Sequence, residues 1–471
     1  MDYKKTIGIE VHCELKTTEK IFSPSLNNYG SIANTNANVI DFGYPGTLPL
    51  LNKEVLKHAI RACHVLNLHI NRDMHFDRKN YFYADNPKNF QITQNETPIG
   101  YDGYVEIEID GQKKKIEILE MHIEEDTCKS VHSNTSSLLD FNRAGVPLIE
   151  IVTKPCMHSE EEAVKYLEKL RELLLYANVS DCKIEEGSMR CDTNVSISKT
   201  DDLGVKIEVK NIGSISNVGE AIRFEALRQE KMLENGECLH EETRRFDDKK
   251  RETVLMRVKE TGNDYRYFPE PDIPFVHLTD DFINSSLVNL SRMPDERRYD
   301  YQKAGILPIN IEKIIANKLL SDYLERFLDV NLVIASNLLL GDITSYLNKN
   351  NQKINDTKMT DEKFRELVVK LDKGEITNKI FKEILNDLME SNQSIKEILD
   401  MRGLNLVNDT NLIDEIIDKV LHENEKIVSD YRNGNIRSAK ALMGLVMKEG
   451  KGQINPSMAN IKLMEKLDSL K

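Results

Sequence analysis

The first half of the chain alternates apolar and polar residues with the period of a β-strand. The clearest case is IGIEVHCEL at residues 7–15, where every second residue is apolar or cysteine. Side chains along a strand point alternately to opposite faces, so one face of this strand is expected in the core. The other face carries Gly8, Glu10, His12 and Glu14. Alternation alone does not separate a solvated face from a functional one, and Glu14, at the strand end, is expected at the surface.

Further strands and helices follow from the same patterns. Two hairpins are predicted, at 104–123 and 188–212, each as two alternating segments around a polar turn. Helical spacing of apolar residues predicts helices at 159–179 and 217–237. Ser159 is the expected N-cap of the first, because a glutamate three residues later completes a capping box.

Strand-like alternation ends near residue 290, and amphipathic helical stretches follow. They are expected at 313–329, 331–348, 360–371, 376–391, 394–402, 411–424 and 437–448. The fold class is therefore predicted to be α+β. A cradle domain of mixed, largely antiparallel sheet is expected at 1–292, an all-α helical domain at 293–405 and a small helical tail domain at 406–471. A hinge is predicted near 400–412, where the sequence is loop-like.

Composition supports a folded protein with several domains. The chain has 471 residues, of which 40% are hydrophobic and 30% charged, and this length favours two to four domains. The seven cysteines are odd in number and form no CxxC pair, which argues for reduced thiols and against a disulfide framework or a structural zinc site. The N-terminus has no apolar core of a signal peptide, and no apolar run reaches membrane length. We therefore expect a cytoplasmic protein.

The net charge of -14 argues against nonspecific nucleic-acid binding over the whole surface. Residues 431–471 differ, because they hold eight lysines and arginines against three acidic residues. A local basic patch is therefore compatible with the acidic total. The sequence has no Walker-type phosphate loop, no GxGxxG, no GxSxG and no HExxH. If the chain binds a nucleotide, it uses an uncommon cradle.

Carboxylates and an imidazole on polar strand faces suit a divalent cation. Glu150 lies in the apolar segment VPLIEIV, where an ionised carboxylate is costly without a metal or a positive partner. A metal ligand and a structural ion pair, for example with Arg143, are equal interpretations. In EMHIEED, a bulge can turn either Glu124 or Glu125 inward, although this segment taken alone favours a solvated acidic strand end. The candidate ligands for a hard ion such as Mg²⁺ are Glu10, His12, Glu124, Glu125 and Glu150.

A second polar face is predicted on the hairpin at 188–212. Alternation places basic, acidic and amide side chains of both strands on one side. Such a floor can hold phosphates or a carboxylate substrate, and ordinary cross-strand surface pairing is the alternative. The candidates for cofactor binding are Arg190, Asp192, Asn194 and Lys210.

Several long segments together resemble GatB, a family of subunits of the glutamyl-/aspartyl-tRNA amidotransferases. They are IGIEVHCELKT, NVIDFGYPGTLPLLN, DRKNYFYADNPKNFQITQ, HIEEDTCKS, NRAGVPLIEIVT, EEGSMRCDTNVSI, ETRRFD, MRVKETGNDYRYFPEPDIP and MPDERR. The segment YRNGNIRSAKALMGLVMKEGKGQINP resembles the YqeY-type tail of the same family. The resemblance runs in collinear order along essentially the whole chain.

The resemblance implies an enzyme that converts Glu-tRNA(Gln) or Asp-tRNA(Asn) to the amide form. ATP and Mg²⁺ phosphorylate the side-chain carboxylate, and ammonia from the glutaminase GatA displaces the phosphate, while GatC wraps the pair of GatA and GatB in a heterotrimer. Carried onto this sequence, phosphoryl-transfer roles fall on Glu10, His12, Glu125 and Glu150, and the tail contacts to tRNA on Arg437, Lys440, Lys448 and Lys451. The resemblance leaves the candidate metal ligands and the candidate cofactor-binding residues unchanged.

The sequence departs from the family pattern at three places. Gly213 stands where an asparagine is usual, Lys154 and Cys156 stand where acids are usual, and the chain has no tryptophan. These departures leave an alternative open, a tRNA-binding or assembly paralogue with reduced catalysis. The acidic faces are intact, which favours the enzyme.

Overall fold

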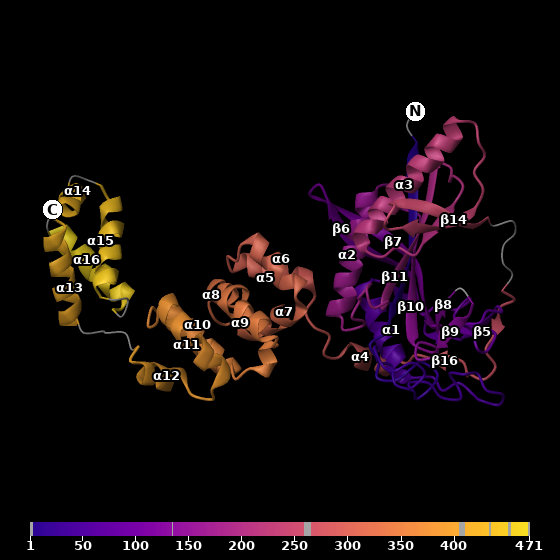
Figure 1. Cartoon of the computed structure of the whole chain (residues 1–471), viewed down its shortest axis with the longest axis horizontal. Helices are drawn as coiled ribbons and strands as arrows, with labels where there is room; N and C mark the ends of the chain where they lie inside the picture. The colour runs from indigo at the N-terminus through magenta and orange to yellow at the C-terminus, as the bar shows by residue number, and fades with distance from the viewer. Residues whose placement is uncertain are drawn as a thin grey trace. The chain divides into compact units, whose positions relative to one another are not determined.

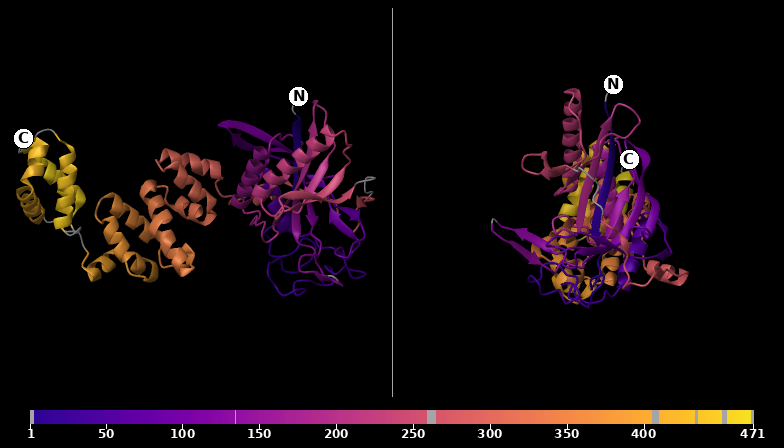
Figure 2. Two further views of the ribbon diagram at one scale, coloured as in Figure 1. Left: turned by 45° about the horizontal axis from the view of Figure 1, so that its top comes forward. Right: turned by 90° about the vertical axis from the view of Figure 1, so that its right-hand side faces the viewer.

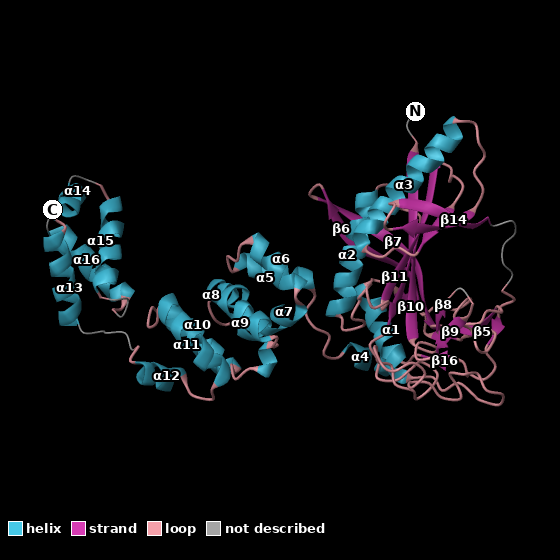
Figure 3. Ribbon diagram, viewed as in Figure 1, coloured by secondary structure: helices cyan, strands magenta, loops and turns pink. Residues whose placement is uncertain are grey.

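The computed structural model in Figure 1 describes residues 3–133, 135–258, 265–404, 410–432, 435–450 and 454–469. The chain divides into two compact units, Met1–Pro294 and Asp295–Lys471. All the strands of the described residues belong to the first unit, and the second is helical (Figure 3). The predicted α+β class is thereby confirmed.

A nine-stranded sheet forms the centre of the first unit. Its strand order is β14-β13-β12-β11-β1-β10-β7-β6-β2. Neighbours pair antiparallel except β12 and β13, which are parallel, so the sheet is mixed and largely antiparallel, as predicted. The bounds are β1 Lys4–Glu14, β2 His69–Ile70, β6 Gly100–Ile109, β7 Gln112–Glu125, β10 Pro147–Thr153, β11 Met189–Ser198, β12 Ile207–Lys210, β13 Glu242–Asp247 and β14 Glu252–Val258. Both predicted hairpins, β6–β7 and β11–β12, are present.

The two faces of β1 have different environments. Ile7, Ile9 and Val11 are at most 1% exposed and lie in one apolar cluster with residues of α2 and α3. The alternate residues of β1 project to the opposite face of the sheet. The helices of this unit are α1 Lys53–Val65, α2 Glu160–Tyr176, α3 Ile215–Glu234 and α4 Asp280–Leu287. Helices α2 and α3 therefore cover one face of the sheet (Figure 2). The opposite face carries polar side chains such as Glu10 and His12.

Local signals explain where α2 begins. The Ser159 side chain accepts a hydrogen bond from the backbone N–H of Glu162 at 3.1 Å, as the capping pattern predicted. Glu160 in the first turn bonds the Lys5 ammonium at 2.8 Å and the Arg223 guanidinium at 3.2 Å. Burial alone would raise the pKa of Glu160, but the hydrogen bond from Lys5 and the other interactions outweigh it and lower the pKa to about 2.

Smaller sheets lie beside the polar face. Strand β4 pairs with β5 and β15, β3 with β16, and β8 with β9. Their bounds are β3 Asp73–Met74, β4 Asp77–Asn80, β5 Phe90–Thr93, β8 Lys129–His132, β9 Ser137–Asp140, β15 Phe268–Pro269 and β16 Val276–His277. Thr93 of β5 donates to the Glu124 carboxylate of β7 at 3.5 Å, which brings the β4–β5 pair against the polar face.

The second unit is built from short helices. They are α5 Pro294–Lys303, α6 Pro308–Ala316, α7 Lys318–Leu324, η1 Glu325–Phe327, α8 Leu332–Leu338, η2 Leu339–Ile343, α9 Thr344–Asn350, η3 Ile354–Asp356, α10 Asp361–Asp372, α11 Asn378–Glu390, α12 Ile395–Arg402, α13 Thr410–Glu423, α14 Glu425–Arg432, α15 Arg437–Glu449 and α16 Pro456–Ser469. Helices α13, α15 and α16 share one apolar cluster. The predicted boundary between helical and tail domains at 405/406 lies outside the described residues.

Two predicted helices are wrong in detail. The stretch 313–329 is not one helix, because Asn317 ends α6 with extended backbone and then caps α7 through its side chain. The stretch 331–348 is interrupted at Gly341, whose backbone is not helical. Apolar spacing continues across both breaks, so periodicity alone did not reveal them. Within the described ranges, no helix is long and apolar enough to cross a membrane.

Candidate active site

Four side chains form a row across four neighbouring strands on the polar face of the sheet. In register, Arg190 of β11 faces His12 of β1, His12 faces Glu150 of β10, and Glu150 faces His122 of β7. Residues that face each other on adjacent strands project to the same side. The Glu150 carboxylate lies 3.3 Å from His12 Nε2 and 2.9 Å from His122 Nε2. The sheet thus brings together residues from widely separated parts of the chain.

Glu124 of β7 completes this group, which we call the acid–imidazole cluster: His12, His122, Glu124 and Glu150. Its carboxylate lies 3.5 Å from His12 Nε2 and 3.8 Å from His122 Nε2, and the residue is only 3% exposed. His12, Glu124 and Glu150 each offer one ligand atom within 4.8 Å of the others. Three of the predicted metal ligands therefore meet in space.

The charges of the cluster compensate one another. Burial by itself lowers the pKa of each histidine, but hydrogen bonds and attraction to the carboxylates outweigh it, which raises the pKa of His12 and takes that of His122 to about 10. Burial also disfavours ionised Glu150, yet the two imidazoles hold its pKa well below the usual range. In the protein alone, the protonated imidazole of His122 thus occupies the electrostatic role that a cation can take.

The donor set fits a divalent cation. Two carboxylates and one imidazole converge; carboxylate oxygens suit Mg²⁺, and imidazole is accepted by several transition ions. His122 Nδ1 is buried and has no hydrogen-bond partner in the described part of the chain. An unsatisfied buried nitrogen is expected where a ligand or solvent completes a site.

Glu10 lies in a neighbouring acidic group instead. Glu10, Asp192 and Glu208 also have ligand atoms within 4.8 Å of one another. Lys210 Nζ bridges the group, at 2.7 Å from Asp192 and 2.9 Å from Glu208, and Asn194 donates to Glu10 at 2.8 Å. The predicted cofactor residues Asp192, Asn194 and Lys210 are therefore side by side, and the predicted metal set divides into two groups.

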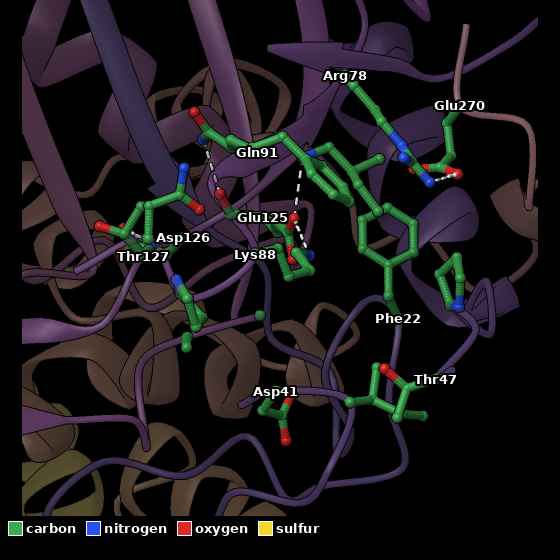
Figure 4. Close-up of a pocket in the computed structure, with 18 of the residues that line it drawn as sticks. Phe22, Asp41, Thr47, Arg78, Lys88, Gln91, Glu125, Asp126, Thr127 and Glu270 are labelled. Carbon is green, nitrogen blue, oxygen red and sulfur yellow. Dashed lines mark hydrogen bonds and ion pairs between the residues drawn. The ribbon is translucent and has the colours of Figure 1, made fainter. Parts of the chain in front are cut away.

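Glu125 is not brought to the cluster. Its Oε1 accepts a hydrogen bond from the Ile92 backbone N–H at 2.9 Å and contacts Lys88 Nζ. Figure 4 shows this carboxylate in a separate pocket with Lys88, Gln91 and Asp41. The register irregularity of β7 against β10 falls between Val152 and Thr153, away from this strand end. Glu124 and Glu125 therefore keep to opposite faces, and Glu124 is the one that faces the histidines.

Two further expectations need correction. Arg143 is not the partner of Glu150, because its guanidinium donates to the carbonyls of Thr127 and Cys128 and lies 3.5 Å from Asp126. Glu14 is half-buried rather than at the open surface. Burial, together with the nearby Asp126 charge, raises the pKa of Glu14 to about 7.

A cavity of about 500 Å³ lies beside the cluster. Its lining includes His12, Arg190, Asp192, Lys210 and Gly213. Arg190 Nη2 donates to Asp126 at 2.9 Å, which fixes one cationic group in the wall. A small molecule with anionic groups can enter this space next to the acidic clusters, since pockets of several hundred Å³ are typical of ligand sites.

Sequence reasoning missed two members of the site. His122 precedes Glu124 by two residues on the same strand face, so the alternation already carried its signal. The sequence gives no such signal for Lys79 of β4. In the structure, burial alone lowers the pKa of the Lys79 ammonium, but attraction to Glu124 and Glu150 raises it. Its ammonium lies 5.0 Å from the centre of the Tyr265 ring. Only the folded chain places Lys79 near the cluster.

The predicted basic residues of the tail share one helix face. Arg437, Lys440 and Lys448 are exposed along α15, opposite the buried Leu442 and Val446. Lys451, the fourth predicted member, lies outside the described residues. The three described cations form an exposed basic face.

Comparison with known proteins agrees with this architecture. Residues 5–284 match the GatB/GatE catalytic domain model and residues 322–467 match the GatB domain model. Proteins named as the B subunit of aspartyl/glutamyl-tRNA(Asn/Gln) amidotransferase from Bacillus cereus (strain AH187) and Lysinibacillus sphaericus (strain C3-41) are each 42% identical to the chain. The Bacillus mycoides (strain KBAB4) protein of that name is 41% identical. The alignments cover 99% of this chain and 99–100% of each relative. The chain therefore belongs to the GatB family of amidotransferase subunits.

Proposed function

We propose that this chain is the subunit of a tRNA-dependent amidotransferase that converts Glu-tRNA(Gln), Asp-tRNA(Asn) or both to the amide form. The side-chain carboxylate of the esterified amino acid attacks the γ-phosphorus of ATP, and ADP leaves. Ammonia then displaces phosphate from the acyl phosphate to give the amide. In this proposal, ammonia comes from glutamine hydrolysed by the partner GatA, and GatC completes the heterotrimer. The relatives' name, that of an aspartyl/glutamyl-tRNA(Asn/Gln) amidotransferase, supports the substrate class.

The acid–imidazole cluster next to the 500 Å³ cavity carries this proposal. Phosphoryl transfer requires positioning and charge neutralisation more than a covalent group. Glu124, Glu150 and His12 converge closely enough to hold one divalent cation. When bound there, Mg²⁺ supplies charge neutralisation for the phosphate oxygens. Arg190 and Lys210, both in the cavity wall, are suited to bind and orient anionic groups of the nucleotide or the substrate carboxylate.

The neighbouring acidic group supports a division of labour. Asn194 orients Glu10 through its 2.8 Å hydrogen bond, and Lys210 balances Asp192 and Glu208. These residues can hold the nucleotide end of the site, while three members of the acid–imidazole cluster lie in the row that contains Arg190. The exposed cations of α15 are suited to phosphates of the tRNA body.

The test is amidation by the complex with GatA and GatC, using Glu-tRNA(Gln) and Asp-tRNA(Asn) side by side. Glu10→Ala and Glu150→Ala are each expected to abolish amidation with at least one substrate. Ammonium salt replaces glutamine in a second series, so that any loss is assigned to this chain. Glu108→Ala, which removes an exposed acid at the end of β6, is the matched control. Amidation at the wild-type rate by either site variant would contradict the site, and a wild-type complex that binds tRNA without amidating it would favour the paralogue with reduced catalysis.

A further inference from the structure

A second cavity, of about 480 Å³, adjoins the site and has no role in the steps above. Its lining includes Glu14, Asn27, Asn28, Asn142 and Ile184. Ile184 also lines the cavity that contains His12, so the two cavities share a wall. Glu14 and His12 are two residues apart on one face of β1, which places them about 7 Å apart along the strand. A ligand in the second cavity therefore lies within reach of the acid–imidazole cluster.

Glu14 is the distinctive group in this cavity. It is half-buried, and no hydrogen bond or ion pair to its carboxylate occurs in the described part of the chain. Two cations of the surrounding walls, Arg190 and Arg143, are already engaged, because they lie 2.9 Å and 3.5 Å from the carboxylate of Asp126. A partly desolvated carboxylate without a partner is costly. Such a group is retained where a ligand supplies the missing donor.

The rest of the lining favours a small cationic and hydrogen-bonding ligand over a phosphate. Asp140, Glu185 and Glu186 also border the cavity, so acidic residues outnumber Lys129 and Arg143 there. Three asparagines also line the cavity. The Asn27 amide already donates to the Leu15 carbonyl and the Asn142 amide to the Ile32 carbonyl. The Asn28 amide is suited to bind an ester or hydroxyl oxygen, and the carboxylates can bind an ammonium group.

We propose that this cavity binds the α-ammonium group of the aminoacyl ester, and that Glu14 is its counter-ion. The proposal rests on the function given above and deepens it. The α-nitrogen and the side-chain carboxylate stand at opposite ends of an extended glutamyl or aspartyl group. With the ammonium on Glu14, the side-chain carboxylate points along β1 toward His12, where it is to be phosphorylated. Glu14 thus positions the substrate and takes no part in bond making.

The test combines an enzyme variant with a substrate variant. Glu14→Gln keeps the shape of the side chain and removes its charge, and tRNA carrying a glutaryl ester in place of glutamyl lacks only the α-amine. The full complex is assayed with both tRNAs for kcat/KM and for equilibrium Kd. Glu14→Gln is expected to lower kcat/KM for Glu-tRNA about 10- to 100-fold and to leave the glutaryl substrate unchanged. Glu108→Gln is the matched control, and thermal midpoints verify folding.

The outcomes separate the inference from the proposed function. An equal penalty on both tRNAs, or no penalty on either, would overturn the role of Glu14, because the effect would then not depend on the amine. If Glu14→Gln does not fold, Glu14→Ala, which also removes the charge, is compared on the same two tRNAs with the same criteria. A wild-type complex that amidates neither Glu-tRNA(Gln) nor Asp-tRNA(Asn) refutes the proposed function, and the Kd values then still decide whether Glu14 recognises the amine.

Discussion

The buried pair of Lys20 and Asp41 offers a quantitative test of what stabilises the pocket that contains Glu125. Lys20 is 0% exposed, and its ammonium lies 3.5 Å from Asp41, whose side chain is 2% exposed. Asp41 also accepts hydrogen bonds from the hydroxyls of Ser23 and Ser25, at 2.7 and 2.6 Å. It lines the pocket in which Glu125 and Lys88 meet (Figure 4). We therefore expect the pair to stabilise the loop that closes this pocket.

The expected size follows from leaving one charge buried without its partner. Breaking a buried pair costs about 3–5 kcal/mol, whereas replacing both members by neutral groups is much milder. The first unit ends at Pro294, and an unfolding entropy of about 2.1 cal/mol/K per residue gives about 0.6 kcal/mol/K for its length. Asp41→Asn is thus expected to lower the midpoint of this unit by about 5–8 °C. The double variant Lys20→Met/Asp41→Asn is expected to recover most of that loss.

Scanning calorimetry of both single variants and the double variant measures the coupling. The matched control is Lys16→Met, because Lys16 and Asp181 also form a pair at 2.8 Å but are 52% and 50% exposed. That exposed pair is expected to contribute at most about 1 kcal/mol, a shift of about 2 °C or less. Strictly additive losses in the Lys20 and Asp41 variants would show that the two charges do not stabilise each other and would refute the reasoning.

Three further predictions concern other parts of the chain. Glu160→Gln is expected to lower the thermal midpoint at pH 7. Because the pKa of Glu160 is lowered to about 2 from 4.5, the difference from wild type should shrink as pH falls below 4.5; a difference that grows in acid contradicts the assignment. Lys440→Glu/Lys448→Glu is expected to weaken tRNA binding and to reduce the salt slope of log K by about 1 per lost phosphate contact, whereas an unchanged slope in a salt titration removes this face from the tRNA site. Gly204→Ala is expected to lower the melting midpoint, because a Cβ there would lie 2.1 Å from the Ile197 carbonyl oxygen, and an unshifted calorimetric midpoint would show that the backbone yields.

Alternation predicted the strands that carry the site because each has a strongly different environment on its two sides. In β1 the buried residues Ile7, Ile9 and Val11 were recognisable from sequence, and the polar side followed from the period of two. The partner strands were not predictable in this way. His12 faces Glu150 through the β1–β10 register, and register depends on the whole sheet. Pairwise contacts in the site therefore required the structure.

Glu124 and Glu125 show the same limit from another direction. The sequence allowed either carboxylate to face inward, because a bulge at the strand end would exchange them. The strand is regular at this point, and the irregularity falls at Val152/Thr153. The irregularity in β10 therefore does not affect which glutamate of β7 points inward. The regular pairing of Leu148 with Glu124 determines it. Lys79 was beyond sequence reasoning because its approach depends on the separate sheet of β4, β5 and β15.

The departures from the family pattern are accommodated locally and leave the acid–imidazole cluster unchanged. At Gly213, a Cβ would meet the Asp248 carboxylate at 2.8 Å. That carboxylate is exposed and accepts a hydrogen bond from Asn217 at 2.8 Å, so the space of a missing side chain is taken by a neighbour. Lys154 lies 3.1 Å from Asp102 at the surface. In a paralogue without catalysis, we would expect the buried carboxylates Glu124 and Glu150 beside His12 to be replaced, because burying carboxylates is costly. Their retention in close contact favours an active enzyme over a tRNA-binding paralogue.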